Sequence, residues 1–190
     1  MTLEGLNTEG VLIFANITKC KAYYSDKEFD YNYPEGLSEL VQHGIVHIIT
    51  TDEAVEVVNF AFDTDEIDLD MWDYHDSYNY LKVDEGDEIR AISHADFTQM
   101  CHHYKGDLEA FVDSSLTLKN ILNPGFEKTK DEYFKYELPL IALPVGTWKI
   151  NVYSLKDENV LGWMEFYMHL EKTVTIDVAK IALKPLEIYA

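Results

Sequence analysis

The sequence predicts a mainly β protein, either an antiparallel β-sandwich or an open barrel, with one or two short helices. Runs rich in β-branched and aromatic residues recur along the chain, polar turn residues separate them, and the last third alternates regularly between apolar and polar positions. With 190 residues, the chain suits one β-rich domain, 1–190, and the alternative is a subdivision near 94–107. The 47% of hydrophobic residues indicates a folded body and not a disordered acidic chain.

The first 44 residues predict one strand, one loop and one short helix. Residues 10–24 are apolar and aromatic, so we expect a strand there, with a bulge near Asn16 where the alternation changes. Residues 25–36 have the polar composition of a loop. Residues 37–43 are long enough for about two helical turns, which Gly44 would end.

The next elements are predicted as two hairpins. Residues 45–50 and 54–62 are apolar at nearly every position, and the three residues between them suit a turn. Because both runs lack a polar face, we expect them to be covered on two sides. Residues 80–83 and 88–93 flank Asp84-Glu85-Gly86-Asp87, which predicts a second hairpin.

The second half is predicted to begin with a helix and to end in regular β-structure. The apolar spacing between 107 and 122 is roughly helical, so we expect one helix within 94–123, ended by Asn123-Pro124-Gly125, and then a loop over 126–132. Strands are predicted at 133–140, 148–153, 161–170 and 173–182, with a turn at Pro144-Val145-Gly146.

The charge of the chain restricts its partners. The net charge is −20, and residues 51–100 alone carry 15 acids and 2 bases. Such a field attracts cations and basic proteins and repels nucleic-acid phosphates and anionic lipid. We therefore expect a basic protein partner, no direct nucleic-acid binding and no membrane binding.

The most concentrated acidic stretch also contains aromatic residues. In 66–72, Ile67, Leu69 and Met71 alternate with acids and then Trp72, which predicts a strand with one buried face and one exposed face. Exposed acids and rings together are suited to a lysine- or arginine-rich partner, because rings supply contact area and cation–π contacts while acids speed association. A plain solvated face is the alternative. The residues of this predicted protein-binding surface are Glu66, Asp68, Asp70, Trp72, Asp73, Tyr74, Asp76, Tyr78 and Tyr80.

Motifs for chemistry are weak, and no catalytic, metal or cofactor residue is predicted. The acids from Asp63 to Asp70 could form an irregular cation site, but an EF-hand loop beginning at Asp63 would need glycine at Asp68 and glutamate at Tyr74. Cys101-His102-His103 lacks a second ligand pair, and on a strand its side chains would point to opposite faces. The sequence contains no Gly-x-Ser-x-Gly elbow and no phosphate-binding glycine loop.

Two further features bear on the cellular environment. Cys20 and Cys101 are the only cysteines, too few for a disulfide framework, so we expect both to be reduced. The N-terminus lacks the basic start and apolar run of a signal peptide, and no run of eighteen apolar residues exists to span a bilayer. These features predict a cytoplasmic protein.

A short segment, Tyr136 to Ile150, resembles the bacterial competence-type nuclease inhibitors, which are small acidic β proteins. An apolar strand, a Pro-Val-Gly turn and a second strand containing Trp148 carry the resemblance, which covers about a tenth of the chain. No motif of inhibitory residues accompanies it, so it implies no site. The acidic, motif-poor chain is also similar as a class to immunity proteins, which neutralise basic nuclease toxins by covering the cationic active site.

Three functional hypotheses follow from the sequence. The first is an immunity or inhibitor protein that docks a basic partner, such as a nuclease toxin, through the acidic and aromatic stretch. The second is a small hydrolase or ligand-binding sandwich that uses carboxylates or histidines brought together by folding; a deep pocket lined by paired acids would favour it. The third is a structural or assembly protein, for which a homo-oligomeric interface would be the sign.

Overall fold

The computed structural model describes residues 1–51, 54–62, 70–156, 165–181 and 186–187, and within them strands outweigh helices, 37% to 32%. The mainly β prediction is confirmed, although five α-helices occur where one or two were expected. The elements are β1 (Thr2–Asn7), β2 (Val11–Asn16), α1 (Ile17–Tyr24), η1 (Glu35–Leu37), α2 (Ser38–Gln42), β3 (Val46–Thr50), β4 (Ala54–Phe62), β5 (Trp72–Val83), β6 (Ile89–Ser93), α3 (His94–Tyr104), α4 (Leu108–Leu122), α5 (Lys130–Tyr136), β7 (Gly146–Leu155), β8 (Glu165–Thr173), η2 (Val178–Lys180) and β9 (Leu186–Glu187).

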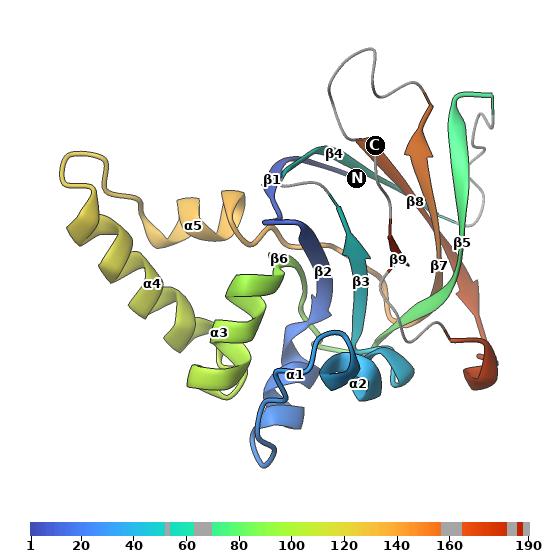
Figure 1. The fold of residues 1–190 in the computed structure, drawn as a ribbon, viewed down its shortest axis with the longest axis horizontal. Helices are drawn as coiled ribbons and strands as arrows, with labels where there is room; N and C mark the ends of the chain where they lie inside the picture. The colour runs from blue at the N-terminus through green and yellow to red at the C-terminus, as the bar shows by residue number, and fades with distance from the viewer. Residues whose placement is uncertain (52–53, 63–69, 157–164, 182–185, 188–190) are drawn as a thin grey trace.

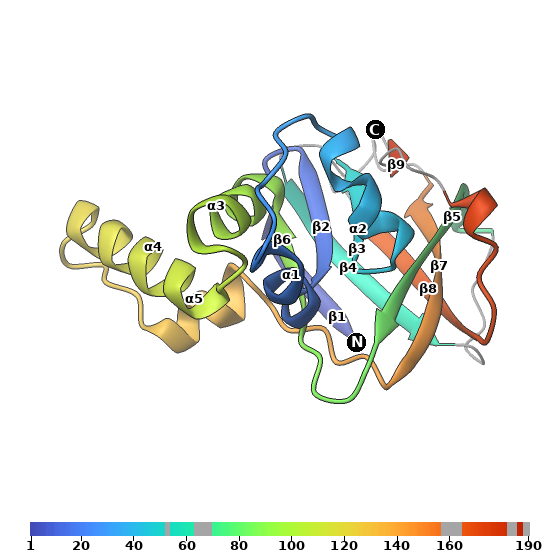
Figure 2. The ribbon, with the colours of Figure 1, turned by 90° about the horizontal axis from the view of Figure 1, so that it is seen from below.

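The strands form two sheets that pack face to face, with helices on the outer side of one of them (Figures 1 and 2). The larger sheet is curled and has the order β1-β4-β8-β7-β5, and the smaller has the order β6-β2-β3-β9. Pairing is antiparallel except for β4 with β8 and β3 with β9. Among the described residues, no helix is both long enough and apolar enough to span a bilayer.

The small sheet separates two apolar cores, which explains why its strands have no polar face. On β2, Leu12 and Phe14 point into the core between the sheets, whereas Ile13 and Ala15 point into the core beneath the helices. Successive side chains of a strand point to opposite faces, so a strand between two cores must be apolar at every position. The predicted two-sided burial of 45–50 is thereby confirmed.

Two predicted strands are partly helical because helix capping outweighs strand propensity, and one predicted helix is divided in two. The strand over 10–24 ends at Asn16, whose side chain accepts a hydrogen bond from Lys19 N and caps α1; the expected bulge is absent there. The first part of the strand predicted over 133–140 is the end of α5, which begins with a reciprocal capping box between Thr129 and Glu132. The single helix predicted within 94–123 is two helices, divided at Lys105, whose φ is 51°.

Both predicted hairpins are wrong for a shared reason. β3 and β4 belong to different sheets, as do β5 and β6, so neither pair forms a hairpin. Neighbouring apolar strands predict burial but do not specify their pairing partner. The strand predicted over 173–182 is also wrong, since its described residues, 173–181, hold the last residue of β8 and the single turn η2 but no further strand.

Candidate functional site

Folding distributes the nine predicted surface residues over three environments. Glu66 and Asp68 lie outside the described residues, as do the side chains of Asp76 and Tyr78. The remaining five are exposed Asp70, Asp73 and Tyr74, half-buried Trp72, and buried Tyr80. The predicted register does not hold at its end, because Met71, expected in the core, is 54% exposed.

Tyr80 belongs to the core and is a correction to the predicted surface. Its hydroxyl donates to the Gln42 carbonyl oxygen at 2.6 Å, and burial raises its pKa. The ladder between β5 and β7 shifts register between His75 and Asn79. β5 advances four residues across this shift while β7 advances two, so Tyr80 stays on the same side of the sheet as Tyr74. Its ring is buried because Gln42 and Gly44 pack against it, a contact that sequence alternation does not reveal.

Trp72 and Tyr74 join two tyrosines that the sequence analysis did not select. The Trp72 and Tyr167 rings lie 5.2 Å apart, and so do the Tyr74 and Tyr153 rings. In the ladders Tyr153 pairs with both Tyr74 and Tyr167, so the four rings span three adjacent strands. We call Trp72, Tyr74, Tyr153 and Tyr167 the aromatic face.

The aromatic face lies on the side of the large sheet opposite its core. Tyr167 stands between Phe166 and Met168, which are buried between the two sheets, so alternation turns the tyrosine outward. Tyr74 is 48% exposed and the other three rings are half-buried. Burial, and then the charge of Glu171, raise the pKa of Tyr153. Tyr153, at the centre of the aromatic face, is therefore neutral at physiological pH.

Carboxylates border the aromatic face, some in ion pairs with lysines and one in a hydrogen bond with an amide. Lys149 lies 3.6 Å from Glu171, and Lys156 lies 4.0 Å from Asp73, so the two lysines are held by acids. Glu165 accepts a hydrogen bond from the Asn59 side chain at 2.7 Å. The border therefore combines acids with the lysines that pair with them.

The comparisons identify no relative. No protein-family model, no curated protein and no solved structure matches the chain.

A serine and a histidine meet on the opposite side of the same strands. His75 Nε2 lies 2.7 Å from Ser154 Oγ, within hydrogen-bonding distance. Burial lowers the pKa of His75, and the charge of Asp73 opposes this shift. A neutral imidazole that accepts a serine proton is the first half of a nucleophilic triad, but no hydrogen bond between Asp73 and His75 is present among the described residues. Sequence reasoning missed this pair because its members are 79 residues apart.

A polar cavity of about 380 Å³ lies where α3 and α5 meet the edges of β1 and β6. Three carboxylates from separate elements line it, Glu9, Asp96 and Glu137, and Lys128 is ion-paired with Glu137. Burial raises the pKa of Asp96. Burial acts in the same direction on Glu137, but Lys128 and Lys119 outweigh it and lower its pKa. Sequence reasoning did not select these acids, which are dispersed among 35.

The histidines do not form a metal cluster. His102 and His103 lie on α3 and not on a strand, with ring centroids 4.2 Å apart, while Cys101 is buried in the helix-side core. His47 is buried in β3. Within the described ranges, no group of three or more His, Cys, Asp or Glu residues could hold a metal ion. The acidic stretch proposed as an irregular cation site lies outside those ranges, apart from Asp70. Cys20 and Cys101 are both free and buried.

Proposed function

We propose that this protein is a binding module for a basic protein partner, of the immunity or inhibitor type, and that the partner docks on the aromatic face. The observation that carries the proposal is the meeting of Trp72, Tyr74, Tyr153 and Tyr167 on three adjacent strands, outside the core. Large partly exposed rings supply most of the energy at many protein interfaces.

The electrostatics support a cationic partner. The strand that supplies Trp72 and Tyr74 belongs to the part of the chain with 15 acids and 2 bases. Lysine and arginine side chains make favourable contacts with aromatic faces, and a negative field accelerates their approach. The β-framework supports the proposal further, because ladder pairing with Tyr153 fixes Tyr74 before any partner arrives.

The test uses a partner that co-purifies with the chain at low salt and elutes as salt is raised. The double substitution Trp72→Ala, Tyr74→Ala should weaken that complex by at least about 30-fold, because the loss of a single interface hot spot already costs about 2 kcal/mol. The control is Tyr31→Ala, which removes a ring that is 61% exposed elsewhere on the molecule. If the double variant binds as tightly as the Tyr31→Ala control, the aromatic face is not the docking site.

The cavity favours a second candidate, a small-molecule binding site or a hydrolase. Its volume lies within the range of ligand pockets, and the opposite pKa shifts of Asp96 and Glu137 resemble the division between an acid and a base. Thermal-shift screening of small amines and sugars against the wild type and Asp96→Asn would test it. Stabilisation of the wild type alone would support this candidate, and no stabilisation by any compound would remove it.

A further inference from the structure

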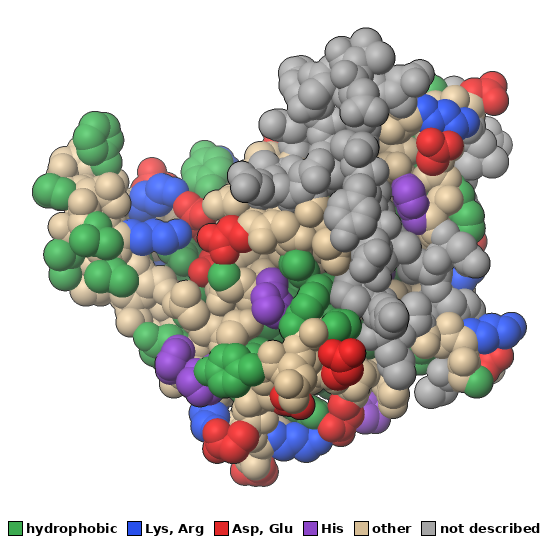
Figure 3. Space-filling model, in the orientation of Figure 1, with side chains coloured by type: hydrophobic (Ala, Val, Ile, Leu, Met, Phe, Trp, Pro, Cys, Tyr) green, Lys and Arg blue, Asp and Glu red, His purple; other side chains and the backbone are tan. Residues whose placement is uncertain are grey.

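The helices α4 and α5 form a hairpin that projects from the body, and its end is apolar. Figure 3 shows hydrophobic side chains gathered at the left end of the molecule, over the end of α4 and the following loop. Four of them, which we call the hairpin tip, are Leu118, Ile121, Leu122 and Phe126, with exposed fractions of 58%, 70%, 68% and 85%. Soluble monomers rarely expose so many large apolar side chains together, and such patches usually mark interaction surfaces.

The hairpin tip continues the apolar stripe along one side of α4, which is buried against the body in the first half of the helix. Phe111 and Val112 are fully buried in the helix-side core. Leu118 follows Phe111 by seven residues, and Leu122 follows it by eleven, so both return to nearly the same side of the helix. The stripe therefore extends beyond the body with its apolar residues exposed.

The loop after α4 is held in place by its own hydrogen bonds. The Asn120 amide donates to the Lys128 carbonyl oxygen at 3.0 Å and accepts from Lys128 N at 2.9 Å. Gly125 N donates to the Glu127 carboxylate at 3.0 Å. Phe126 is thus presented outward by an ordered loop, which reduces the entropy lost when it is buried by a partner.

Charge is kept away from the tip. Residues 114–126 contain one lysine and no acid, in a chain with a net charge of −20. The lysines near the tip are paired within the hairpin: Lys119 and Lys128 with Glu137, and Lys130 with Glu109 and Asp113. The Glu127 carboxylate, next to Phe126, accepts a hydrogen bond from Gly125 N and has no lysine partner among the described residues. Burying the tip would therefore leave no unpaired charge from this segment away from water.

We propose that the hairpin tip binds the tip of a second copy of the chain, forming a two-fold symmetric dimer by helix-to-helix packing. Two acidic chains repel each other, so self-association needs a contact that is charge-poor and distant from most of the acid. The tip meets both conditions, because α4 and the acidic β5 lie at opposite ends of the longest axis (Figure 1). Debye screening of about 8–10 Å at physiological salt removes the remaining repulsion over that distance.

The exposed area is sufficient for a weak dimer. Each of the four side chains exposes on the order of 100 to 200 Å², so two copies together would bury about 1,000 Å², the lower limit for a specific interface. The expected dimer is therefore reversible, with dissociation in the micromolar range. It would leave both aromatic faces exposed, so the inference does not depend on the proposed function.

Sedimentation equilibrium of the full chain tests the dimer, over a wide range of chain concentration at low and high salt. The wild type should dimerise, and the dissociation constant should fall as salt rises, because salt screens the repulsion between two acidic chains. This is the opposite of the salt dependence expected for a basic partner on the aromatic face. The double substitution Ile121→Glu, Phe126→Glu should raise the dissociation constant by at least about 100-fold, because a symmetric contact contains each change twice.

The control substitution is Val174→Glu, which adds the same charge at a residue that is 98% exposed and far from the hairpin in sequence. It should dimerise like the wild type, and circular dichroism should show all three proteins folded, since the substituted side chains are exposed. A monomeric wild type at every concentration would overturn the proposal. A dimer unaffected by the double substitution would do the same, as would a monomer that binds lipid vesicles through Phe126.

Discussion

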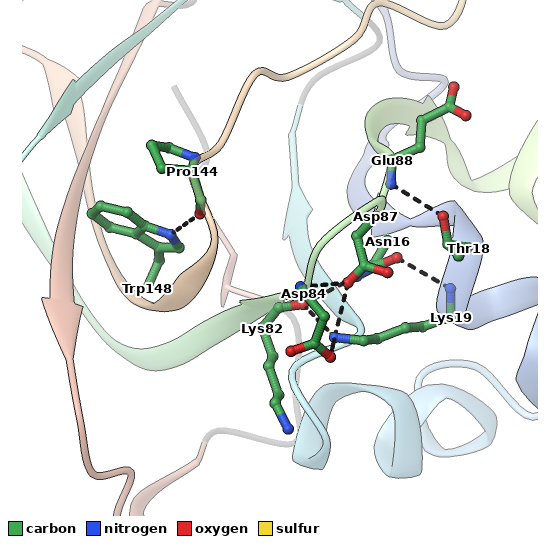
Figure 4. Close-up of polar contacts among 9 residues, drawn as sticks. All are labelled: Asn16, Thr18, Lys19, Lys82, Asp84, Asp87, Glu88, Pro144 and Trp148. Carbon is green, nitrogen blue, oxygen red and sulfur yellow. Dashed lines mark hydrogen bonds and ion pairs between the residues drawn. The ribbon is translucent and has the colours of Figure 1, made fainter.

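Asn16 should be among the most important polar side chains for stability, and Asn16→Ala is the substitution that tests this. The side chain is fully buried where β2 ends and α1 begins, and it makes three hydrogen bonds (Figure 4). Its oxygen accepts from Lys19 N at 3.1 Å, and its nitrogen donates to the Lys82 carbonyl oxygen at 3.0 Å and to the Asp87 carboxylate at 2.7 Å. One side chain thus connects α1 to both ends of the connection between the two sheets.

The expected loss in the free energy of unfolding is about 3.5 to 4 kcal/mol. Loss of the helix cap contributes about 1 kcal/mol. Loss of the Asn16 amide nitrogen removes one hydrogen bond from the Lys82 carbonyl oxygen and one from the Asp87 carboxylate. The first loss costs about 1 kcal/mol because the acceptor is neutral, and the second costs about 1.5 to 2 kcal/mol because the acceptor is charged. The Asp87 carboxylate is only 6% exposed, so water replaces little of what is lost, although Lys19 at 3.0 Å remains.

Asn16→Ser separates the contributions, because serine caps a helix but is too short to reach Lys82 and Asp87. It should be about 1 kcal/mol more stable than Asn16→Ala in urea unfolding followed by circular dichroism. A loss below about 1 kcal/mol for Asn16→Ala, or equal stability of the two variants, would refute this reasoning.

The pH dependence gives a second readout for the same residue. Burial acts to raise the pKa of Asp87, but hydrogen bonds from Asp84 N, Asn16 and Lys19 outweigh it and lower the pKa. The folded state therefore binds fewer protons than the unfolded state, so this stabilisation is present above about pH 4 and is lost as the pH falls through the lower folded value. The difference between wild type and Asn16→Ala should accordingly shrink in acid.

Two further substitutions test the packing of buried groups. Burial lowers the pKa of His47 to about 3, and its Nε2 has no hydrogen-bond partner among the described residues. Because the unfolded state binds a proton that the folded state does not, the free energy of unfolding should fall by about 1.4 kcal/mol per pH unit between about pH 6.5 and about pH 3. His47→Phe, which keeps a ring against Phe14, should flatten this slope in urea titrations at several pH values; an unchanged slope would show that other groups cause it. Gly44→Ala should lower the free energy of unfolding by about 2 to 4 kcal/mol, because φ at this position is +66° and the new Cβ would overlap the Tyr80 ring. Gly86→Ala is the control, because Gly86 has a φ of +83° but open space around it, and it should lower the free energy of unfolding by only about 1 kcal/mol. Similar losses for Gly44→Ala and Gly86→Ala would argue against an overlap with the Tyr80 ring.

The predictions from sequence succeeded where a short pattern decides the outcome. The mainly β class, the strand over 148–153 and the two-sided burial of 45–50 depend on alternation and composition, which are local properties. The acidic character is a property of composition alone, and the proposal of a basic partner rests on it. Trp72 and Tyr74 are partly exposed, as expected, and their role in binding stays a prediction.

Tertiary structure decided what local patterns leave open. Whether an apolar run between two turns pairs with its neighbour or crosses to another sheet depends on which core can accommodate it, so β3 and β4 separated despite a short connection. Tyr153 and Tyr167 joined Trp72 and Tyr74 only because β7 lies between β5 and β8. The exposed end of α4 has the same apolar spacing as its buried beginning, since periodicity defines a stripe but not how far the body of the protein covers it.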